Sequence, residues 1–351
     1  MISFYPGPSQ VYDQVPAYVR DAFDAGVLGM NHRSDECMAL VNETQSLLRD
    51  RLSIPDDYHI YFVSSATECW EIIAQSLAVD GSFHVFNGAF GQKWFDYTQR
   101  ISKHANPKSF DREELIPLSS LNPQAKDVIC ITQNETSNGT QVNLGALSQL
   151  RASFPKNLIA VDATSSMAGI ELNFSLGDIW FASVQKCFGL PAGLAILISS
   201  PKAREKFLQI NERDYYNSLT FIDEMMAKRQ TPYTPNVLGI YLLMRSLKDR
   251  PSIRTTAKII RGRFSKWIDF IEQSRFQHLI ANADARSYTV IPIRGQELEI
   301  TRIKASAKAA GFLLGEGYGE LKKNTFRIAN FPALKDTELN ALRQVLARIN
   351  V

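Results

Sequence analysis

The sequence of 351 residues has little that would assign it to a membrane, a zinc site or a redox centre. No stretch approaches the roughly 18 uninterrupted apolar residues that a membrane-spanning helix needs, so we expect no membrane contact. Only four cysteines occur and no two have CxxC spacing, which argues against a zinc or dithiol motif. We therefore expect no metal, and a reduced, cytoplasmic protein in which most of the cysteines are small buried apolar residues.

Further absences narrow the functional classes. The segment Met1–Pro8 has neither a basic stretch nor a long apolar run, so we expect no secretory signal. No GxxxxGK[ST] loop is present, which argues against a nucleotide hydrolase. There is also no internal repeat and no low-complexity tract. With 45% hydrophobic and 21% charged residues, the composition is that of an ordinary globular enzyme.

Charge is unevenly distributed, although the net charge is only +3. From Tyr241 onward the chain holds 20 Lys and Arg against 10 Asp and Glu, so acidic residues predominate before it. A basic third can indicate nucleic-acid binding, but these residues are scattered without a dense run. We expect no nucleic acid, and instead predict that the two parts attract each other and concentrate a small anionic substrate between them.

Helix-like and strand-like patterns alternate from about residue 35 to residue 240. Short apolar strands separated by helices predict an α/β fold with a mostly parallel sheet covered on both faces. A smaller α+β unit follows and ends in a helix that begins near Asp336. The expected helices are 35–52, 67–79, 91–102, 144–153 and 236–247, and the expected strands include 58–63, 82–86, 128–133, 158–161 and 194–199.

Lys186 lies between two apolar strands, in the segment from Asp178 to Gly193. Burial disfavours the charged form of lysine and lowers its pKa, which makes the amine a usable nucleophile for Schiff-base chemistry. A surface lysine on a hairpin loop is the alternative. The flanking strands are too apolar for a surface hairpin, so we favour the catalytic interpretation.

Polar residues follow several of the expected strands, where ligands collect in an open α/β sheet. Asp162 ends a strand 24 residues before Lys186, and it is suited either to hold magnesium or to face a cationic ring nitrogen. Ser65 and Glu68 have capping-box spacing, so a helix begins there with N–H groups that either serve only a cap or bind phosphate.

Three other segments allow more than one interpretation. Asn134–Gly139 is rich in turn residues, and Thr136 within it can donate to a phenolic oxygen above the sheet. Phe90 lies between glycines, so it is either a core residue or a stacking partner for a flat ring. The glycine-rich segment Gly315–Gly319 resembles a dinucleotide loop, but no helical pattern follows it and we expect a turn.

Lys186 within Ser-Val-Gln-Lys, Asp162 after its strand and Ser65–Glu68 at a helix start together resemble pyridoxal phosphate enzymes of fold type I. Within these, the chain is similar to the phosphoserine aminotransferases of the class V aminotransferase group. The resemblance covers residues 4 to 330, and the segments that carry it further are Phe4–Pro8, Asn31–Ser34, Asn134–Thr136, Thr231–Asn236 and Thr325–Asn330.

The resemblance implies a domain organisation and an assembly. It predicts an N-terminal arm over residues 1–15 that packs with the small domain. A large cofactor-binding domain with a mostly parallel seven-stranded sheet would cover residues 16–240, and a smaller α+β domain residues 241–351. A homodimer is implied, because Thr231 is expected to reach the cofactor phosphate of a neighbouring subunit.

The resemblance also implies a role for each site residue. Lys186 would form the Schiff base with pyridoxal 5'-phosphate and then move the substrate α-proton, while Asp162 pairs with the ring nitrogen. Substrate contacts would come from Arg327, at the α-carboxylate, and from His32 with Arg33, at the phosphate. The remaining cofactor contacts are Phe90 on the ring, Thr136 beside the phenolic oxygen, and Ala66, Thr67, Gln185 and Thr231 at the phosphate.

The implied reaction is transamination between O-phospho-L-serine and 2-oxoglutarate in serine biosynthesis. The sequence departs from the family pattern at Phe90, where tryptophan is common, at Gln230 before Thr231, where asparagine is common, and at Lys322 and Lys323, where a histidine often lies. The main alternative is a class V aminotransferase that uses alanine, serine or glyoxylate. A cysteine desulfurase is disfavoured because no cysteine follows Cys187, and a cofactor-free binding protein because Lys186 and Asp162 are both present.

Overall fold

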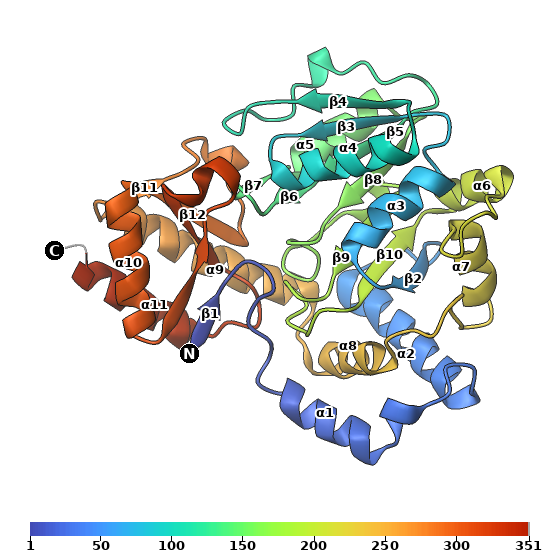
Figure 1. Ribbon diagram of the computed structural model, residues 1–351, viewed down its shortest axis with the longest axis horizontal. Coiled ribbons are helices and arrows are strands. Elements are labelled where there is room, and N and C mark those ends of the chain that lie inside the picture. Colours follow the sequence, from blue (N-terminus) through green and yellow to red (C-terminus); the bar gives the residue numbers. More distant parts are fainter. Residues whose placement is uncertain (350–351) are drawn as a thin grey trace.

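The computed structural model describes residues 1–349, and its largest element is a seven-stranded sheet (Figure 1). The strand order is β2–β10–β9–β8–β5–β3–β4, and every neighbouring pair is parallel except the two that involve β10. The expected mostly parallel seven-stranded sheet is therefore confirmed. Its strands are β2 (His59–Val63), β3 (Ser82–Phe86), β4 (Ala105–Ser109), β5 (Val128–Thr132), β8 (Leu158–Asp162), β9 (Ile179–Ser183) and β10 (Ala195–Ser199).

Helices connect and cover these strands. α3 and α4 pack on the sheet and on each other, whereas α2 packs against α8. Two of the expected helices, 35–52 and 144–153, have the predicted bounds. Each begins at a side-chain cap: Ser34 accepts from Cys37 N–H, and Asn143 from Ala146 N–H. The helices of this part are α1 (Val15–Asp24), α2 (Asp35–Leu52), α3 (Ala66–Ser76), α4 (Ala89–Ile101), α5 (Leu144–Ser153), α6 (Pro201–Ile210), α7 (Leu219–Met226) and α8 (Val237–Asp249).

A second, five-stranded sheet combines the start of the chain with its C-terminal part. Strand β1 (Ile2–Phe4) is parallel to β13, so the first residues belong to the C-terminal sheet. The predicted boundary at residue 240 falls within α8, and the domain boundaries stay predictions. The remaining elements are β11 (Gln277–His278), β12 (Val290–Arg294), β13 (Phe312–Glu316) and β14 (Thr325–Ala329), with α9 (Ile253–Glu272), α10 (Glu297–Ala309) and α11 (Asp336–Ile349) beside them.

The expected turn at Gly315–Gly319 is shorter than predicted. Gly315 and Glu316 are the last residues of β13 and pair with Arg327 and Phe326 of β14. The chain turns only after them, towards a short 3-10 helix that begins at Gly319. The apolar run in 312–316 is only three residues long and ends at a glycine, so it does not reveal this strand, which pairs with β1 and β14.

A short hairpin, β6 (Asn134–Glu135) and β7 (Thr140–Gln141), lies between the two sheets in Figure 1. Gly139 forms its turn with φ +72°, and the Gly139 carbonyl accepts from Ser287 N–H of the C-terminal part. The hairpin therefore connects the carboxyl end of β5 to the second sheet.

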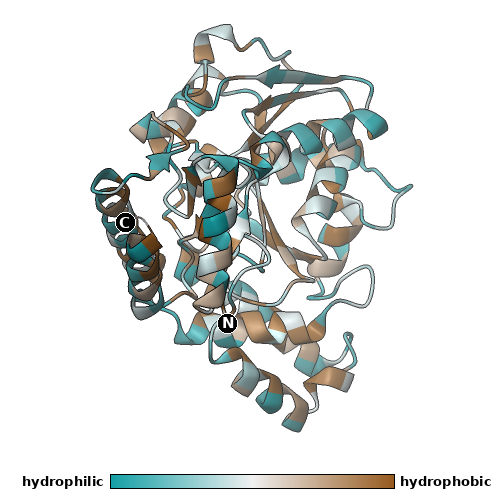
Figure 2. Cartoon of the chain, turned by 60° about the vertical axis from the view of Figure 1, so that its left-hand side comes forward, coloured by the Kyte–Doolittle hydropathy of each residue, from teal (hydrophilic) through white to brown (hydrophobic). Residues whose placement is uncertain are grey.

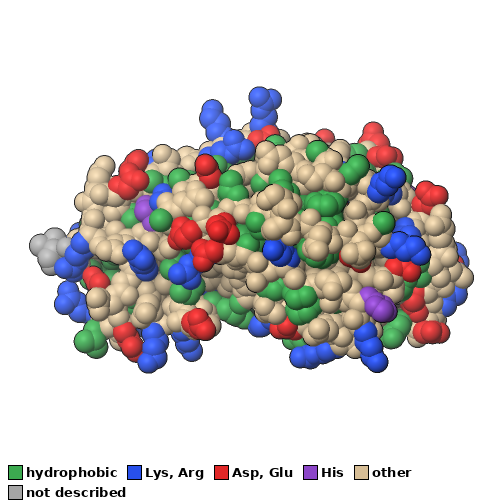
Figure 3. Space-filling view, turned by 90° about the horizontal axis from the view of Figure 1, so that it is seen from above, with side chains coloured by type: hydrophobic (Ala, Val, Ile, Leu, Met, Phe, Trp, Pro, Cys, Tyr) green, Lys and Arg blue, Asp and Glu red, His purple; other side chains and the backbone are tan. Residues whose placement is uncertain are grey.

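The core and the surface follow the expected division of residue types. Apolar residues of the strands lie between helices whose outward sides are hydrophilic (Figure 2), and all four cysteines are buried. No helix within residues 1–349 is both long and apolar enough to cross a membrane. On the face shown in Figure 3, charges of both signs are interspersed.

Some basic residues of the C-terminal third form ion pairs with acidic residues earlier in the chain. Within residues 1–349, four surface ion pairs join basic residues after Tyr241 to acidic residues before it. Two of them connect α8 to α1 and α2, and the other two involve residues beyond α8. Each of these pairs contributes at most about 1 kcal/mol, so they assist the packing without dominating it. The pairs are Arg245–Asp21, Lys248–Glu43, Arg261–Glu171 and Lys335–Asp13.

Replacing Gly139 by alanine should destabilise the protein by about 2–4 kcal/mol. An added Cβ would lie 2.4 Å from Pro292 Cδ, and the left-handed backbone adds strain. The urea midpoint of unfolding measures the effect. Gly262→Ala is the matched control, because it lies in α9 with open space around it and should be neutral or stabilising by up to about 1 kcal/mol. Equal midpoints for the two variants would contradict the assigned role of Gly139.

Candidate active site

A cavity of about 230 Å³ opens at the carboxyl ends of the central strands. Asp162 is the last residue of β8, Ser183 the last of β9, and α3 begins directly beyond β2. Eight of the sequence-predicted site residues line this one cavity: Ala66, Thr67, Phe90, Thr136, Asp162, Gln185, Lys186 and Arg327. These residues are far apart in the sequence. Seven of them end or follow strands of the seven-stranded sheet, which brings them to one edge, and Arg327 enters from β14 of the second sheet.

Lys186 is buried with 8% of its surface exposed, as the apolar flanking strands predicted. Its Nζ donates to Thr136 Oγ1 at 2.8 Å and lies 5.1 Å from the centre of the Phe90 ring. Burial lowers the pKa of Lys186 to about 8, against the opposing effect of Asp162 and Glu135. The N-terminal arm adds to this burial, because an added Cβ at Gly7 would lie 2.8 Å from Lys186 Cε.

Asp162 is a buried carboxylate held by two donors. Its Oδ1 accepts from Thr164 N–H at 2.9 Å, and its Oδ2 accepts from the Trp70 indole N–H at 3.2 Å. Burial raises the pKa of Asp162, and these hydrogen bonds and Lys186 only partly oppose that effect. A carboxylate in such a position is stabilised in its charged form by a cationic partner, which a protonated ring nitrogen would supply.

Glu135 fixes the start of α4 and with it Phe90. One carboxylate oxygen accepts from the N–H groups of Phe90 and Gly91, each at 3.1 Å, and the other accepts from the Ser137 N–H and hydroxyl. These contacts satisfy donors that a helix start leaves free. They also explain why α4 begins at Ala89, two residues before the sequence-based estimate, since Glu135 is distant in sequence.

The start of α3 forms the wall of the cavity that is suited to an anion. Ser65 Oγ accepts from Glu68 N–H at 3.1 Å, which confirms the predicted cap. Glu68 accepts from Ser64 N–H at 2.7 Å, and Ser183 Oγ accepts from Ala66 N–H at 2.7 Å. A helix start of this kind attracts negative charge through its N–H groups and dipole.

The polar groups of the cavity fit pyridoxal phosphate. Gln185 Oε1 and Thr132 Oγ1 are buried and have no hydrogen-bond partner within the described part of the chain, although both residues line the cavity. Unpartnered buried polar atoms are costly, so they indicate that a polar ligand or water completes the site. That cofactor has three groups to be bound. Lys186 suits its aldehyde, Asp162 its ring nitrogen, and the start of α3 its phosphate.

Arg327 brings a buried guanidinium into the same cavity from β14. Its Nε donates to the Glu316 carbonyl at 2.6 Å and its Nη1 to the Thr136 carbonyl at 2.7 Å. Burial lowers the pKa of Arg327 to about 10, and within residues 1–349 it forms no ion pair with a carboxylate. A buried cation without an anionic partner is well suited to bind a substrate carboxylate.

Three predicted site residues do not line this cavity. His32 and Arg33 lie before α2. The Arg33 side chain is exposed, and the backbone N–H of Arg33 donates to Asn31 Oδ1. Thr231 is buried, and its hydroxyl donates to the Tyr233 carbonyl. Their predicted contacts with phosphate groups stay predictions.

Sequence reasoning missed several residues that shape the cavity. Trp70 donates to Asp162, Ser165 bonds to both Asn134 and Thr136, and Tyr318 lines the cavity from the loop after β13. Trp70 lies one helical turn after Ala66 in α3, so the helical spacing could have indicated that both side chains face the cavity. Tyr318 was in the glycine-rich segment that we interpreted only as a turn.

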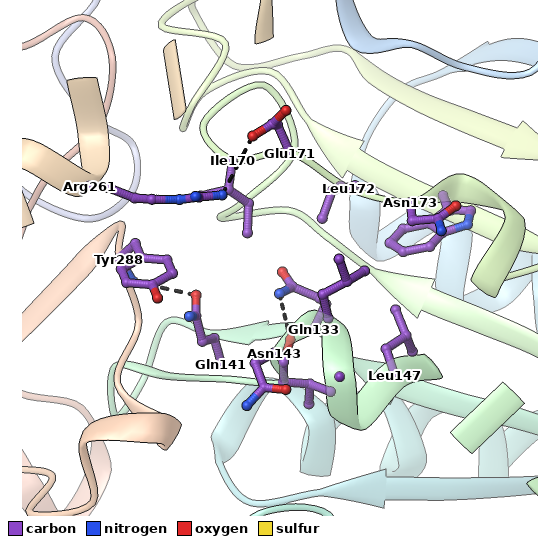
Figure 4. Close-up of a pocket in the computed structure, with 14 residues that line it drawn as sticks. Gln133, Gln141, Asn143, Leu147, Ile170, Glu171, Leu172, Asn173, Arg261 and Tyr288 are labelled. Atoms are coloured by element: carbon purple, nitrogen blue, oxygen red, sulfur yellow. Dashed lines mark hydrogen bonds and ion pairs between the residues drawn. The ribbon is translucent and has the colours of Figure 1, made fainter. Parts of the chain in front are cut away.

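A second cavity, of about 540 Å³, lies beside β7, the start of α5 and Arg261 of α9 (Figure 4). None of the sequence-predicted site residues lines it. Across it, Arg261 pairs with Glu171 at 3.5 Å, and Tyr288 N–H donates to Gln141. The catalytic interpretation therefore rests on the smaller cavity. Nowhere in residues 1–349 do three or more His, Cys, Asp or Glu side chains gather as a metal site would require.

Comparisons with known proteins agree with this geometry. The family model described as aminotransferase class V matches residues 6–85 and 100–300. The phosphoserine aminotransferase of Corynebacterium glutamicum is 29% identical over 353 residues, which covers 96% of this chain and 91% of that protein.

Solved structures show the same relationship. A phosphoserine aminotransferase from Cytophaga hutchinsonii has a TM-score of 0.94 and 30% identity, with 99% of this chain and 98% of that one covered. An alanine–glyoxylate aminotransferase from Nostoc has a TM-score of 0.83 at 18% identity, with 98% and 95% covered, and so shares the fold. The chain belongs to the class V aminotransferase family and, within it, to the phosphoserine aminotransferases.

Proposed function

We propose that this chain uses pyridoxal 5'-phosphate to transfer the amino group of O-phospho-L-serine to 2-oxoglutarate, giving 3-phosphohydroxypyruvate and L-glutamate in serine biosynthesis. The observation that carries the proposal is the placement of Lys186, Asp162 and Arg327 in one cavity. In that arrangement the amine can bind an aldehyde, the carboxylate can pair with a ring nitrogen, and the guanidinium can bind a substrate carboxylate.

When bound, the cofactor supplies an aldehyde for amino groups and a ring that accepts the electrons released at the substrate α-carbon. Asp162 would pair with the ring nitrogen and favour its protonated form, because a buried carboxylate favours a cationic neighbour. Lys186 Nζ carries the α-proton, for which a pKa of about 8 suits it near neutral pH. Thr136 orients this amine through its hydroxyl.

Arg327 would orient the substrate through its α-carboxylate. Phosphoserine, 2-oxoglutarate and both products share that group, so one guanidinium serves both half-reactions. The distal phosphate or carboxylate needs a second cation, and Lys186 and Arg327 are the only Lys or Arg residues among those that line the cavity. His32 and Arg33 would supply that charge from a second copy of the chain.

A homodimer is therefore part of the proposal. It would place Thr231 at the cofactor phosphate of the other subunit and complete the distal anion site with His32 and Arg33. Support for the dimer comes from the position of these residues outside the cavity of their own chain.

We also propose a cytoplasmic location, in keeping with four buried cysteines that form no disulfide.

The competing function is transamination of alanine, serine or glyoxylate, because an alanine–glyoxylate aminotransferase shares the fold. With 2-oxoglutarate as acceptor, we expect phosphoserine to be the better donor by at least about tenfold in kcat/KM, since its phosphate adds a charge-assisted contact. Glutamate formation is the measurement. A higher kcat/KM for alanine than for phosphoserine would favour the competing function.

Replacing Arg33 by alanine should raise the KM for phosphoserine by about 10- to 100-fold and affect alanine little, because only phosphoserine carries a phosphate. Arg327→Lys should instead weaken every substrate, since each has an α-carboxylate. Arg302→Ala, an exposed arginine on α10, is the control and should behave as the unchanged protein. Equal losses for phosphoserine and alanine in the Arg33 variant would contradict its phosphate-binding role.

The cofactor-free protein should bind pyridoxal phosphate covalently at a rate that rises with pH and levels off above about pH 8. Only the neutral amine attacks an aldehyde, and burial lowers the pKa of Lys186 from 10.5 to about 8. At pH 7 about a tenth of the amine is then neutral, against fewer than about one in a thousand for an ordinary lysine. Stopped-flow absorbance follows the covalent linkage.

An Asp162→Asn variant tests the origin of that pH dependence. The Asp162 carboxylate raises the pKa of Lys186, so its removal should move the midpoint to lower pH. A midpoint near that of free lysine in the unchanged protein would show that Lys186 is not buried as described.

A further inference from the structure

Tyr318 contacts both sides of the active-site cavity. It lies in the loop between β13 and the 3-10 helix at Gly319, and it lines the cavity from the C-terminal side. Its ring centre is 5.3 Å from that of Phe90, and its hydroxyl is 2.6 Å from Lys93 Nζ, both on the first turns of α4. One tyrosine therefore joins the second sheet to the helix start that Glu135 fixes.

Tyr318 also lies beside Arg327. The Arg327 guanidinium carbon lies 5.7 Å from the centre of the Tyr318 ring, a distance at which a cation is attracted by an aromatic face. Hydrogen bonds to the carbonyls of Glu316 and Thr136 use two of the guanidinium N–H groups and leave the others free for an anion. The Tyr318 ring therefore adds a third contact to the Arg327 guanidinium, besides the two hydrogen bonds.

Lys93 holds the tyrosine in this position. An ammonium has donors only, so in the 2.6 Å contact it donates to the phenol oxygen, and the phenol proton stays free to donate elsewhere. This hydrogen bond raises the pKa of Lys93, so the amine stays charged at neutral pH.

We propose that Tyr318, held by Lys93, is a positioning residue that orients Arg327 towards the anionic group of the substrate. The inference rests on the proposed role of Arg327 and deepens it by naming what keeps the guanidinium in place. The proposal assigns a function to two residues for which the sequence carried no signal. Because both half-reactions use the same carboxylate contact, substrates of both should weaken together.

Glutarate is a suitable probe, since it has the carbon skeleton of glutamate but neither an amino nor a keto group to react. Its Kd for the cofactor-loaded protein is measured by calorimetry for Lys93→Met, Tyr318→Phe and the double variant. We expect each single variant to raise the Kd by about 3- to 10-fold, the loss of one hydrogen bond to a charged group. The double variant should lose no more than a single one, because both changes remove the same hydrogen bond.

Kinetics separate positioning from general damage. KM for phosphoserine and for 2-oxoglutarate should rise by similar factors, while kcat and the melting temperature change little. Tyr318→Ala should weaken glutarate further than Tyr318→Phe, because it also removes the ring beside Arg327. Arg100→Met is the matched control: Arg100 lies on the same helix, over the Tyr97 ring at 5.0 Å, and outside the cavity lining.

Two results would overturn the inference. A Tyr318→Phe variant that binds glutarate as tightly as the unchanged protein, while Lys93→Met binds it weakly, would mean that the lysine acts through its charge alone. Additive losses in the double variant would mean that the two residues act separately. Glutarate binding is measured without turnover, so failure of phosphoserine as a donor would leave this test intact and would count only against the proposed substrate.

Discussion

The buried amine of Lys186 sets the demands that the surrounding structure meets. Taking a lysine out of water disfavours its charge, and here burial lowers its pKa to about 8. The negative charges of Asp162 and Glu135 oppose this lowering of the Lys186 pKa. Neither carboxylate lies in an ion pair within residues 1–349, so both remain available to balance charge inside the cavity. The site is thus a small set of buried charges that a ligand completes.

Thr136 has a central place in this arrangement, because it contacts both cations of the cavity. Its hydroxyl accepts from Lys186 and its carbonyl accepts from Arg327. The hydroxyl also donates to Ser165, which in turn donates to the Asn134 carbonyl. A change in the hairpin that carries Thr136 would therefore move the reacting amine and the substrate-binding guanidinium together.

Much of the fold and part of the site were predictable from the sequence, and the difference has a physical origin. The strands are continuous apolar runs, and helices such as 35–52 begin at local caps, so both leave local patterns. Lys186 and Asp162 were found because a charged residue after an apolar strand is unusual. Glu135 and Tyr318 act through contacts with distant segments, which leave no local pattern. The start of α4 was misplaced by two residues for the same reason.

The pairing of β1 with β13 has a consequence for the order of assembly. The partners of Ile2–Phe4 are Phe312–Leu314, so β1 has no strand to pair with until β13 has been synthesised. The following residue Gly7 packs on Lys186, and Ser9 bonds to the Gln185 carbonyl. The segment that covers Lys186 is thus anchored through β1 only once β13 has been made, so we expect this side of the cofactor pocket to close late in translation.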